Sequence, residues 1–379
     1  MSVSIQKKDL LDAMQKAFPV VPAKSSLMIL SNFRMSYADS VLEVSATDAD
    51  HSLRVTAGAS GAGTLDITVN ARKVFEVVRE LPEGSVTLDV DGMVLLMESE
   101  KGFSCKIAGA DPSDFPGVPE IEGGVDLGVS GAIFRDMIQK SSFAVSKDES
   151  RASLCGIFWE LTPEKMGMVA TDGHRLGCSF VNMSLPVEEK VSRIISQKSV
   201  ATLIRITDSK NQDESVRVVI GDKYVLFATP SFTMVAKIIE GQYPEYNKVI
   251  PKNNPKVIFA DRVALLDAIR RVSVLTNQKN RLIKLTFTPG SMEAAGTNRE
   301  IGGEAREVVP VQYDGGEHVV GFNGQYFTEI LDIVKTQRVR LEMNSQTSAC
   351  LIFPEYADEK EKVSDDLFLL MPLRIMDEV

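Results

Sequence analysis

The sequence contains few of the residues from which most catalytic and metal sites are built. Its 379 residues include only three histidines, four cysteines and one tryptophan. The cysteines lie 50, 23 and 172 positions apart, at Cys105, Cys155, Cys178 and Cys350. No pair has the close spacing of a zinc motif, and four cysteines are too few for a disulfide framework. We therefore expect reduced thiols, no metal and no other cofactor.

Long hydrophobic runs are also missing. No apolar stretch approaches the ~20 residues that a membrane-spanning helix needs, and the start of the chain lacks the apolar segment of a signal peptide. These absences favour a cytoplasmic protein that does not contact membranes. The composition, with 44% hydrophobic and 25% charged residues, is that of ordinary globular domains. The length suggests two or three such domains at ~150 residues each.

The sequence repeats itself about every 125 residues. A small residue followed by Thr and a polar residue occurs as Ala46-Thr47-Asp48, as Ala170-Thr171-Asp172 and, more weakly, as Gly296-Thr297-Asn298, with the threonines 124 and 126 positions apart. Apolar residues at helical spacing precede each marker, at 10–14, 134–138 and 265–269. A second helical pattern opening on cap-type residues follows each marker, at 70–78, 196–204 and 322–331.

Each third therefore predicts the order helix, strands, helix, strands. Alternating β-branched stretches follow the second helix of each third, at 85–88, 94–98, 216–220, 224–228, 339–343 and 349–353. Chance similarity is the alternative, but chance does not readily place a marker and two helices at one period. We predict an α+β protein of three tandem similar domains, spanning 1–124, 125–252 and 253–379, with turn-rich boundaries.

Positive charge is in deficit overall, with 42 Lys and Arg against 52 Asp and Glu, which by itself argues against a nucleic-acid partner. Its distribution points the other way. Six windows around the expected helices hold 23 basic and 11 acidic residues, so they carry +12 while the whole chain carries −10. The windows are 7–24, 71–80, 133–151, 193–210, 262–281 and 325–340.

Basic residues on a single helix are most simply explained as a solvated face that balances acidic strands. Six repeated helices of the same sign are better explained by a shared surface for a polyanion. Few Asn, Gln or aromatic residues accompany the positive charges, so such a surface would bind a nucleic-acid backbone without selecting a sequence.

Catalytic motifs are absent. The nucleophile elbow Gly-x-Ser-x-Gly and the phosphate-binding loop Gly-x-x-x-x-Gly-Lys-Ser/Thr do not occur. The three histidines, His51, His174 and His318, fall in different thirds. A hydrolase using Asp172 and His174 is an alternative, but no serine is marked as its nucleophile. We expect a protein that is not an enzyme, in which His174 has a structural or ligand-lining role.

The C-terminal segment is unusually apolar. Leu369–Met371 is expected to form a last core strand, and Pro372 to end it. Leu373 and Ile375 would then be free to line a surface groove.

Three motifs together carry a family resemblance: Thr171-Asp172-Gly173-His174-Arg175-Leu176, Tyr243-Pro244-Glu245-Tyr246 and Met371-Pro372-Leu373-Arg374. With them the chain resembles, over its whole length, the bacterial DNA polymerase III β subunits, the replicative sliding clamps. The resemblance implies a head-to-tail homodimer in which six domains close a ring around duplex DNA, with helices inside and sheets outside. It also implies a processivity factor that tethers polymerases to DNA.

The resemblance further implies a pocket for short linear peptides of the replicative polymerase's catalytic subunit, the clamp loader, and repair and translesion polymerases. The matching positions are Leu154, Thr171, Gly173, His174, Arg175, Leu176, Pro244, Lys248, Val249, Thr347, Met371, Pro372, Leu373 and Arg374. Lys248 and Thr347 stand where some members have Arg and Val, which puts the peptide preference in question. The residues Met376 to Val379 extend past the point where some members end, and their role is left open.

The resemblance carries two further sets of residues. Positions matching the lining of the hole, where DNA would pass, are Lys24, Arg151 and Lys198, although Ala152 and Ser153 stand where the family can have Tyr. Positions matching the dimer interface are Lys73, Phe103 and Cys105 on one side and Val274, Leu275, Glu304 and Glu307 on the other. The rival hypothesis is a multi-domain protein-interaction scaffold that does not encircle DNA.

Overall fold

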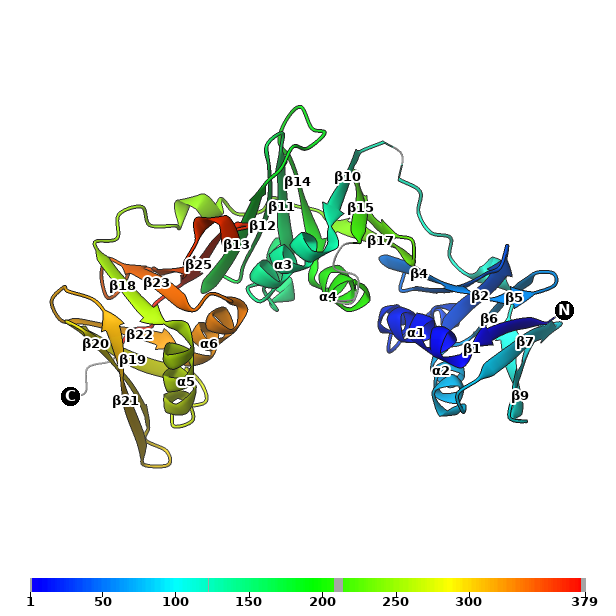
Figure 1. Cartoon of the computed structure of the whole chain (residues 1–379), viewed down its shortest axis with the longest axis horizontal. Helices are drawn as coiled ribbons and strands as arrows, with labels where there is room; N and C mark the ends of the chain where they lie inside the picture. Colours follow the sequence, from blue (N-terminus) through cyan, green and yellow to red (C-terminus); the bar gives the residue numbers. More distant parts are fainter. Residues whose placement is uncertain (1, 122, 208–213, 376–379) are drawn as a thin grey trace. The chain divides into compact units, whose positions relative to one another are not determined.

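The computed structural model describes residues 2–121, 123–207 and 214–375. Short helices alternate with antiparallel strands along the chain, as Figure 1 shows. This arrangement confirms the predicted α+β class. Within the described residues, no helix combines the length and the apolar character that crossing a membrane would demand.

All six predicted helices are present. They are α1 (Lys7–Ala17), α2 (Ala71–Glu80), α3 (Gly131–Ser142), α4 (Gln197–Ile206), α5 (Arg262–Ser273) and α6 (Gly324–Ile333). Several begin after a side chain that caps them. The Asn70 side chain accepts a hydrogen bond from the amide of Lys73, and the Asn323 side chain accepts from the amides of Gln325 and Tyr326. Such caps satisfy amides that a helix leaves unpaired at its start.

The chain forms two compact units, which divide within α3 and α4. The first contains Met1–Phe134 and Lys198–Ile238. Its strands, all paired antiparallel, are β1 (Val3–Gln6), β2 (Asn32–Ala38), β3 (Val41–Thr47), β4 (His51–Gly58), β5 (Ser60–Gly61), β6 (Leu65–Asn70), β7 (Ser85–Asp91), β8 (Val94–Ser99), β9 (Ser104–Ala110), β10 (Val125–Ser130), β15 (Ser215–Ile220), β16 (Tyr224–Thr229) and β17 (Phe232–Ile239).

The second unit contains Arg135–Gln197 and Ile239–Val379. Its strands, again antiparallel, are β11 (Gly156–Thr162), β12 (Lys165–Thr171), β13 (Arg175–Asn182), β14 (Val191–Ser196), β18 (Lys256–Asp261), β19 (Leu282–Thr288), β20 (Ser291–Asn298), β21 (Gly303–Gln312), β22 (His318–Asn323), β23 (Arg338–Met343), β24 (Cys350–Glu355) and β25 (Asp365–Leu370). Each unit follows a sheet that continues from one third of the chain into the next. The two units therefore do not test the domain limits near residues 124 and 252, which stay predictions.

The repeated Thr markers have equivalent places in the fold. Thr47 ends β3 and Thr171 ends β12, and each hydroxyl donates to the carbonyl oxygen four residues later, at 2.9 and 2.7 Å. The strand after each turn pairs with the last strand of the next third, β4 with β17 and β13 with β25. The sequence period therefore marks the turn that precedes each junction between neighbouring thirds.

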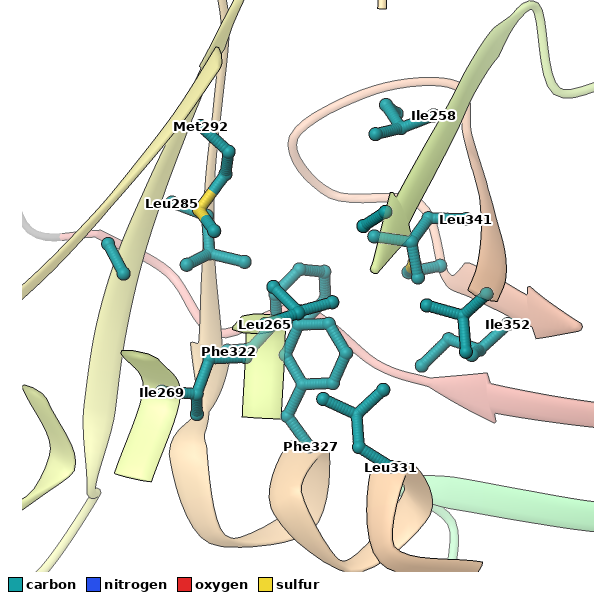
Figure 2. Packing of buried hydrophobic residues seen from close by; sticks show 14 of the residues in the cluster. Ile258, Leu265, Ile269, Leu285, Met292, Phe322, Phe327, Leu331, Leu341 and Ile352 are labelled. Atoms are coloured by element: carbon teal, nitrogen blue, oxygen red, sulfur yellow. The ribbon is translucent and has the colours of Figure 1, made fainter. Parts of the chain in front are cut away.

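The core of the last third lies between α5, α6 and the strands around them. Figure 2 shows Leu265 and Ile269 of α5 and Phe327 and Leu331 of α6 pointing into it, together with strand residues such as Phe322. Phe322 and Phe327 meet edge to face, with ring centroids 5.6 Å apart. The apolar faces that predicted these helices are therefore the faces they bury.

Candidate functional site

The hexapeptide at 171–176 forms a tight turn between β12 and β13. Asp172 Oδ1 accepts hydrogen bonds from the amides of His174 and Arg175, at 2.9 and 3.0 Å. Thr171 Oγ1 accepts from the amide of Gly173 at 3.1 Å. Gly173 has φ +90°, a backbone conformation that side chains disfavour. The sequence of the motif thus fixes the path of its backbone.

Arg175 is buried, and two carboxylates hold its guanidinium. Its Nε donates to Asp172 Oδ2 at 3.1 Å, and its Nη1 is paired with Glu329 of α6. The guanidinium carbon lies 4.2 Å from the centroid of the Tyr326 ring and 5.4 Å from that of Phe143. The Arg175 side chain is only 8% exposed, and it fastens the turn to α6.

The same turn holds the C-terminal segment. The amide of Met371 donates to the carbonyl oxygen of His174 at 2.8 Å, and the amide of Leu373 donates to that of Gly321 in β22 at 2.8 Å. Met371 and His174 are exposed, while Leu373 and Ile375 are half-buried. The strand β25 ends at Leu370, one residue earlier than predicted.

The backbone of Leu373 is held by a bridge to β22. Its half-buried side chain is the part that is left to line the predicted groove. A Cβ atom on Gly321 would lie 2.8 Å from Leu282 Cδ1, 2.9 Å from Leu373 O and 3.0 Å from Ile375 Cγ1. Only glycine lets the segment approach the sheet this closely.

An apolar cluster lies beside this segment. It joins parts of the chain that are far apart in sequence: Leu154, Val169, Leu176, Cys178, Ile194, Tyr243, Tyr246, Ala349, Leu351 and Leu369. Phe158 packs against it and stacks on Tyr243, with ring centroids 4.7 Å apart. Burial raises the pKa of both Tyr243 and Tyr246, so both hydroxyls stay protonated.

All fourteen predicted pocket residues lie in the second compact unit. Leu154 and Leu176 are buried in the apolar cluster, and Thr171 and Pro372 are half-buried. The exposed members are Gly173, His174, Pro244, Lys248, Val249, Thr347, Met371 and Arg374. Val249 is 58% and Met371 38% exposed, which is high for apolar side chains.

A cavity of about 500 Å³ lies next to the turn. Arg151, His174 and Arg175 line it, as do residues that the sequence did not single out for this place, Phe143, Gln325, Tyr326 and Glu329 among them. Gln325, Tyr326 and Glu329 lie in α6, which the second repeat marker had predicted as a helix. Nothing in the sequence, however, indicated that α6 lies beside the turn.

The predicted hole-lining residues have different surroundings. Lys24 is exposed in the loop before residue 28, and no ion pair of Lys24 occurs in the described parts of the chain. Arg151 is 44% exposed, and its Nε donates to Asp148 Oδ2 at 3.1 Å. Lys198, at the start of α4, is paired with Asp48. Lys24 and Lys198 belong to the first unit and Arg151 to the second.

Asp48 is a strong partner for Lys198. Burial alone would raise the pKa of this carboxyl, but hydrogen bonds from His51 and Lys198 outweigh that effect and lower the pKa below its ordinary value. The amide of His51 also donates to Asp48 Oδ1 at 2.7 Å. The Lys198 ammonium is thus already neutralised within the protein.

The predicted interface residues lie at β9 and α2 in the first unit and at β21 and the end of α5 in the second. Phe103, which is 42% exposed, and half-buried Cys105 lie at the start of β9, and exposed Lys73 lies on α2 beside Glu76, at 3.1 Å. In the second unit Val274 is 73% exposed, as are the nearby Ile301 and Val308 at 66% and 62%. Leu275 is half-buried. Glu304 pairs with Arg306 at 2.6 Å, and Glu307 pairs with Arg271 at 2.5 Å.

Comparison with family models matches three consecutive parts of the chain. Residues 1–119 match the N-terminal domain, 128–245 the central domain and 247–367 the C-terminal domain of the DNA polymerase III beta subunit.

Individual relatives match along the whole length. The chain is 30% identical to the beta sliding clamp of Pseudomonas putida and 29% to that of Escherichia coli strain K12, covering 99% of this chain and 100% of each relative. The crystal structure of the DNA polymerase sliding clamp from Pseudomonas aeruginosa with ligand is similar with a TM-score of 0.91 at 29% identity. The clamp of the same organism bound to griselimycin gives 0.92 at 29%. Both comparisons cover 99% of this chain and 100% of the other.

Proposed function

The chain belongs to the DNA polymerase III beta subunit family, and on that premise we propose how its residues bind DNA, a second copy and client proteins. It is a DNA sliding clamp of three tandem clamp domains, a processivity factor and not an enzyme. We place the domain limits at 1–124, 125–252 and 253–379. By holding a polymerase beside its primer, a clamp raises the local concentration of polymerase, so that dissociation no longer ends synthesis.

Two copies close head to tail into a ring, and the repeat supports this assembly. Within the chain, β4 pairs with β17 and β13 with β25. The strand equivalent to β4 and β13 in the last third is β21, which pairs with β18 only through Val311 and Gln312. The strand equivalent to β17 and β25 in the first third is β9, which pairs with β6 only through Gly109 and Ala110. Among the described strands, the outer edges of β21 and β9 therefore keep unpaired backbone N–H and C=O groups. These groups are available to a second copy of the chain.

The side chains beside these edges suit the contact. Phe103 and Cys105 would meet Val274 and Leu275 in an apolar centre, with Lys73 on one side and Glu304 and Glu307 on the other. Because both glutamates already have arginine partners at 2.6 and 2.5 Å, the charges would be shared with Lys73 rather than newly neutralised. The apolar centre would therefore supply most of the binding free energy.

Three cations, Lys24, Arg151 and Lys198, line the hole through which duplex DNA passes; we call them the hole cations. They would contact phosphates only, so binding would be independent of base sequence and sensitive to salt. Lys24 should contribute most, because Arg151 and Lys198 must loosen their bonds to Asp148 and Asp48 before they can contact DNA.

The groove beside the 171–176 turn binds client peptides. The observation that carries this proposal is the hydrogen bond from the Met371 amide to the His174 carbonyl, which holds the exposed Met371 against the 171–176 turn. Val249, Met371 and Leu373 would form apolar walls, and His174 a polar edge. Such a groove suits an extended peptide with one or two large apolar anchors and a Gln-like polar group. Its clients would be the replicative polymerase, the clamp loader, and repair and translesion polymerases.

A truncation after Leu370 tests the groove. It removes one wall, so the truncated protein should lose binding to a fluorescent polymerase-derived peptide, which the intact protein binds with a Kd on the order of micromolar. It should still dimerise, because the proposed interface residues lie elsewhere, and it should fail to stimulate long synthesis on primed circular DNA. If the truncated protein binds the peptide as tightly as the intact protein, the groove is elsewhere.

Truncation also removes the bridge from Leu373 to Gly321, so it could unfold the last third. Leu373→Ala keeps the backbone bridge and removes most of the side chain. This variant should keep the circular dichroism and thermal midpoint of the intact protein and bind the peptide at least ten-fold more weakly. A dimer that binds peptide normally but neither binds DNA nor stimulates synthesis would instead indicate the scaffold hypothesis.

A further inference from the structure

A second cavity lies between the end of α5 and the start of α6. It has a volume of about 340 Å³. Arg270, Ser273, Thr276, Gln278 and Arg281 line it from α5 and the segment after it, and Gln325 and Thr328 line it from α6. Every one of these described residues carries hydrogen-bond donors, and none is acidic. In a chain of net charge −10 this is an unusual concentration of donors and positive charge.

Arg281 supplies positive charge to the cavity. The part of the chain that the structure describes contains no ion pair to its guanidinium, and the residue is half-buried. Its backbone is held from both sides, since its amide donates to the Asn277 carbonyl at 2.8 Å and its carbonyl accepts from the Gly324 amide at 2.9 Å. The side chain therefore starts from a fixed point at the cavity.

Arg270 supplies a second guanidinium. It is 51% exposed, and both of its hydrogen bonds to Asp332, at 2.6 and 2.8 Å, use Nη2. Within the described residues, its Nε and Nη1 are left for another acceptor. Two guanidinium groups facing one cavity favour a ligand with several anionic oxygens, because their planar forks match such oxygens well.

Ser273 points to a ligand independently of charge. Its hydroxyl is buried without a hydrogen-bond partner among the described residues. It is pressed against α6, since a Cβ atom on Gly324 would lie only 2.4 Å from Ser273 Oγ. Buried hydroxyls are normally paired, and an unpaired one at a cavity is satisfied when a bound oxygen accepts its proton.

We propose that this cavity binds one phosphate group, held by Arg281, Arg270 and the Ser273 hydroxyl. The phosphodiester of duplex DNA is the source we favour, an assignment that rests on the proposed function. The window 262–281, with five basic residues and one acidic, is the most positive of the six helix windows, yet none of the hole cations comes from it. A free phosphate, or the phosphate of a nucleotide, is the other source with the same chemistry.

The first arm of the test uses inorganic phosphate and the full-length protein. Phosphate should raise the thermal midpoint of the unmodified protein more than chloride does at equal ionic strength, because a ligand that binds only the folded state stabilises it. In Arg281→Gln and Ser273→Ala this difference should shrink to the general stabilisation that phosphate salts give any folded protein. Lys279→Gln is the matched control: it removes the same charge from the same segment, but Lys279 is exposed and does not line the cavity.

The second arm uses a fluorescent duplex at several salt concentrations. Arg281→Gln should lower the slope of log affinity against log salt by about 0.9, the value for one lost phosphate contact, relative to Lys279→Gln. If the substitutions alter both the phosphate-dependent thermal midpoint and the salt slope of DNA binding, the site binds a DNA phosphodiester. If only the phosphate arm changes, the site binds a small phosphate and the DNA source is refuted.

The remaining outcomes separate the two proposals. If neither arm responds to Arg281→Gln, the phosphate site does not exist. If the unmodified protein fails to bind duplex at all, the proposed function fails, while the phosphate arm still decides the site. Without phosphate, Ser273→Ala should keep or raise the thermal midpoint, because it removes an unsatisfied hydroxyl. A lower midpoint would assign Ser273 a purely structural role and remove it from the site.

Discussion

Lys140→Met should destabilise the second compact unit strongly, because it breaks a buried ion pair. The Lys140 ammonium on α3 lies 2.7 Å from Asp366 Oδ2 on β25, 2.5 Å from Asp136 Oδ2 and 2.9 Å from Ser364 Oγ. The side chains of Lys140 and Asp366 are 9% and 0% exposed. Methionine fills the same volume but leaves Asp366 a buried carboxylate without a cation. Breaking such a pair costs ~3–5 kcal/mol.

The expected pH dependence has a definite sign. Burial raises the pKa of Asp366, and Lys140 opposes that shift, so removing the lysine should raise the pKa further. A carboxyl whose pKa is raised on folding costs no stability below its unfolded value of ~3.9. It destabilises the fold increasingly as pH rises from that value to its folded value. The deficit of Lys140→Met should therefore be large near pH 7 and shrink toward pH 4. The pKa of Lys140 is itself raised, so the unmodified protein should lose this contribution at pH values above ~10.4.

Urea unfolding followed by circular dichroism at pH 4 to 8 would measure these differences. Lys165→Met is the matched control, since Lys165 lies 3.9 Å from Asp365 and both side chains are well exposed, at 38% and 49%. That variant should stay within ~1 kcal/mol of the unmodified protein. Lys140→Met together with Asp366→Leu should recover part of the loss, because no unpaired charge stays buried. Equal stabilities for Lys140→Met and Lys165→Met at pH 7 would refute the reasoning.

Three other predictions follow from the proposed contacts. Charged residues in place of both Val274 and Leu275 should give a folded monomer, because the contact would then bury charge against apolar groups; a dimer in sedimentation would place the interface elsewhere. Replacing the three hole cations together with Ala should lower the slope of log affinity for DNA against log salt by up to about 2.7, at 0.9 per phosphate contact; unchanged affinity for linear DNA at low salt would refute the assignment. Gly321→Ala should displace the C-terminal segment and weaken peptide binding, since its Cβ would lie 2.9 Å from Leu373 O; a crystal structure with the segment unmoved would contradict this.

Local patterns in the sequence determined much of the fold. The Asn residues before α2 and α6 cap helices because a short side chain there reaches the next free amides, which needs no distant partner. The Thr-Asp markers predicted repeated structure because they close their own turns, with hydrogen bonds spanning four residues or fewer. Apolar spacing predicted all six helices for the same reason: the pattern and the structure share one short period.

Side-chain partners that are distant in sequence were decided only by the tertiary structure. The pattern that marked Arg175 as a site residue could not reveal that Glu329, 154 positions later, engages its guanidinium. Nor could it reveal that Asp48, 150 positions earlier, neutralises Lys198. The sequence lists which charges exist, but the free energy of each depends on burial and on the nearest opposite charge, and both are set when β13 pairs with β25 and β4 with β17.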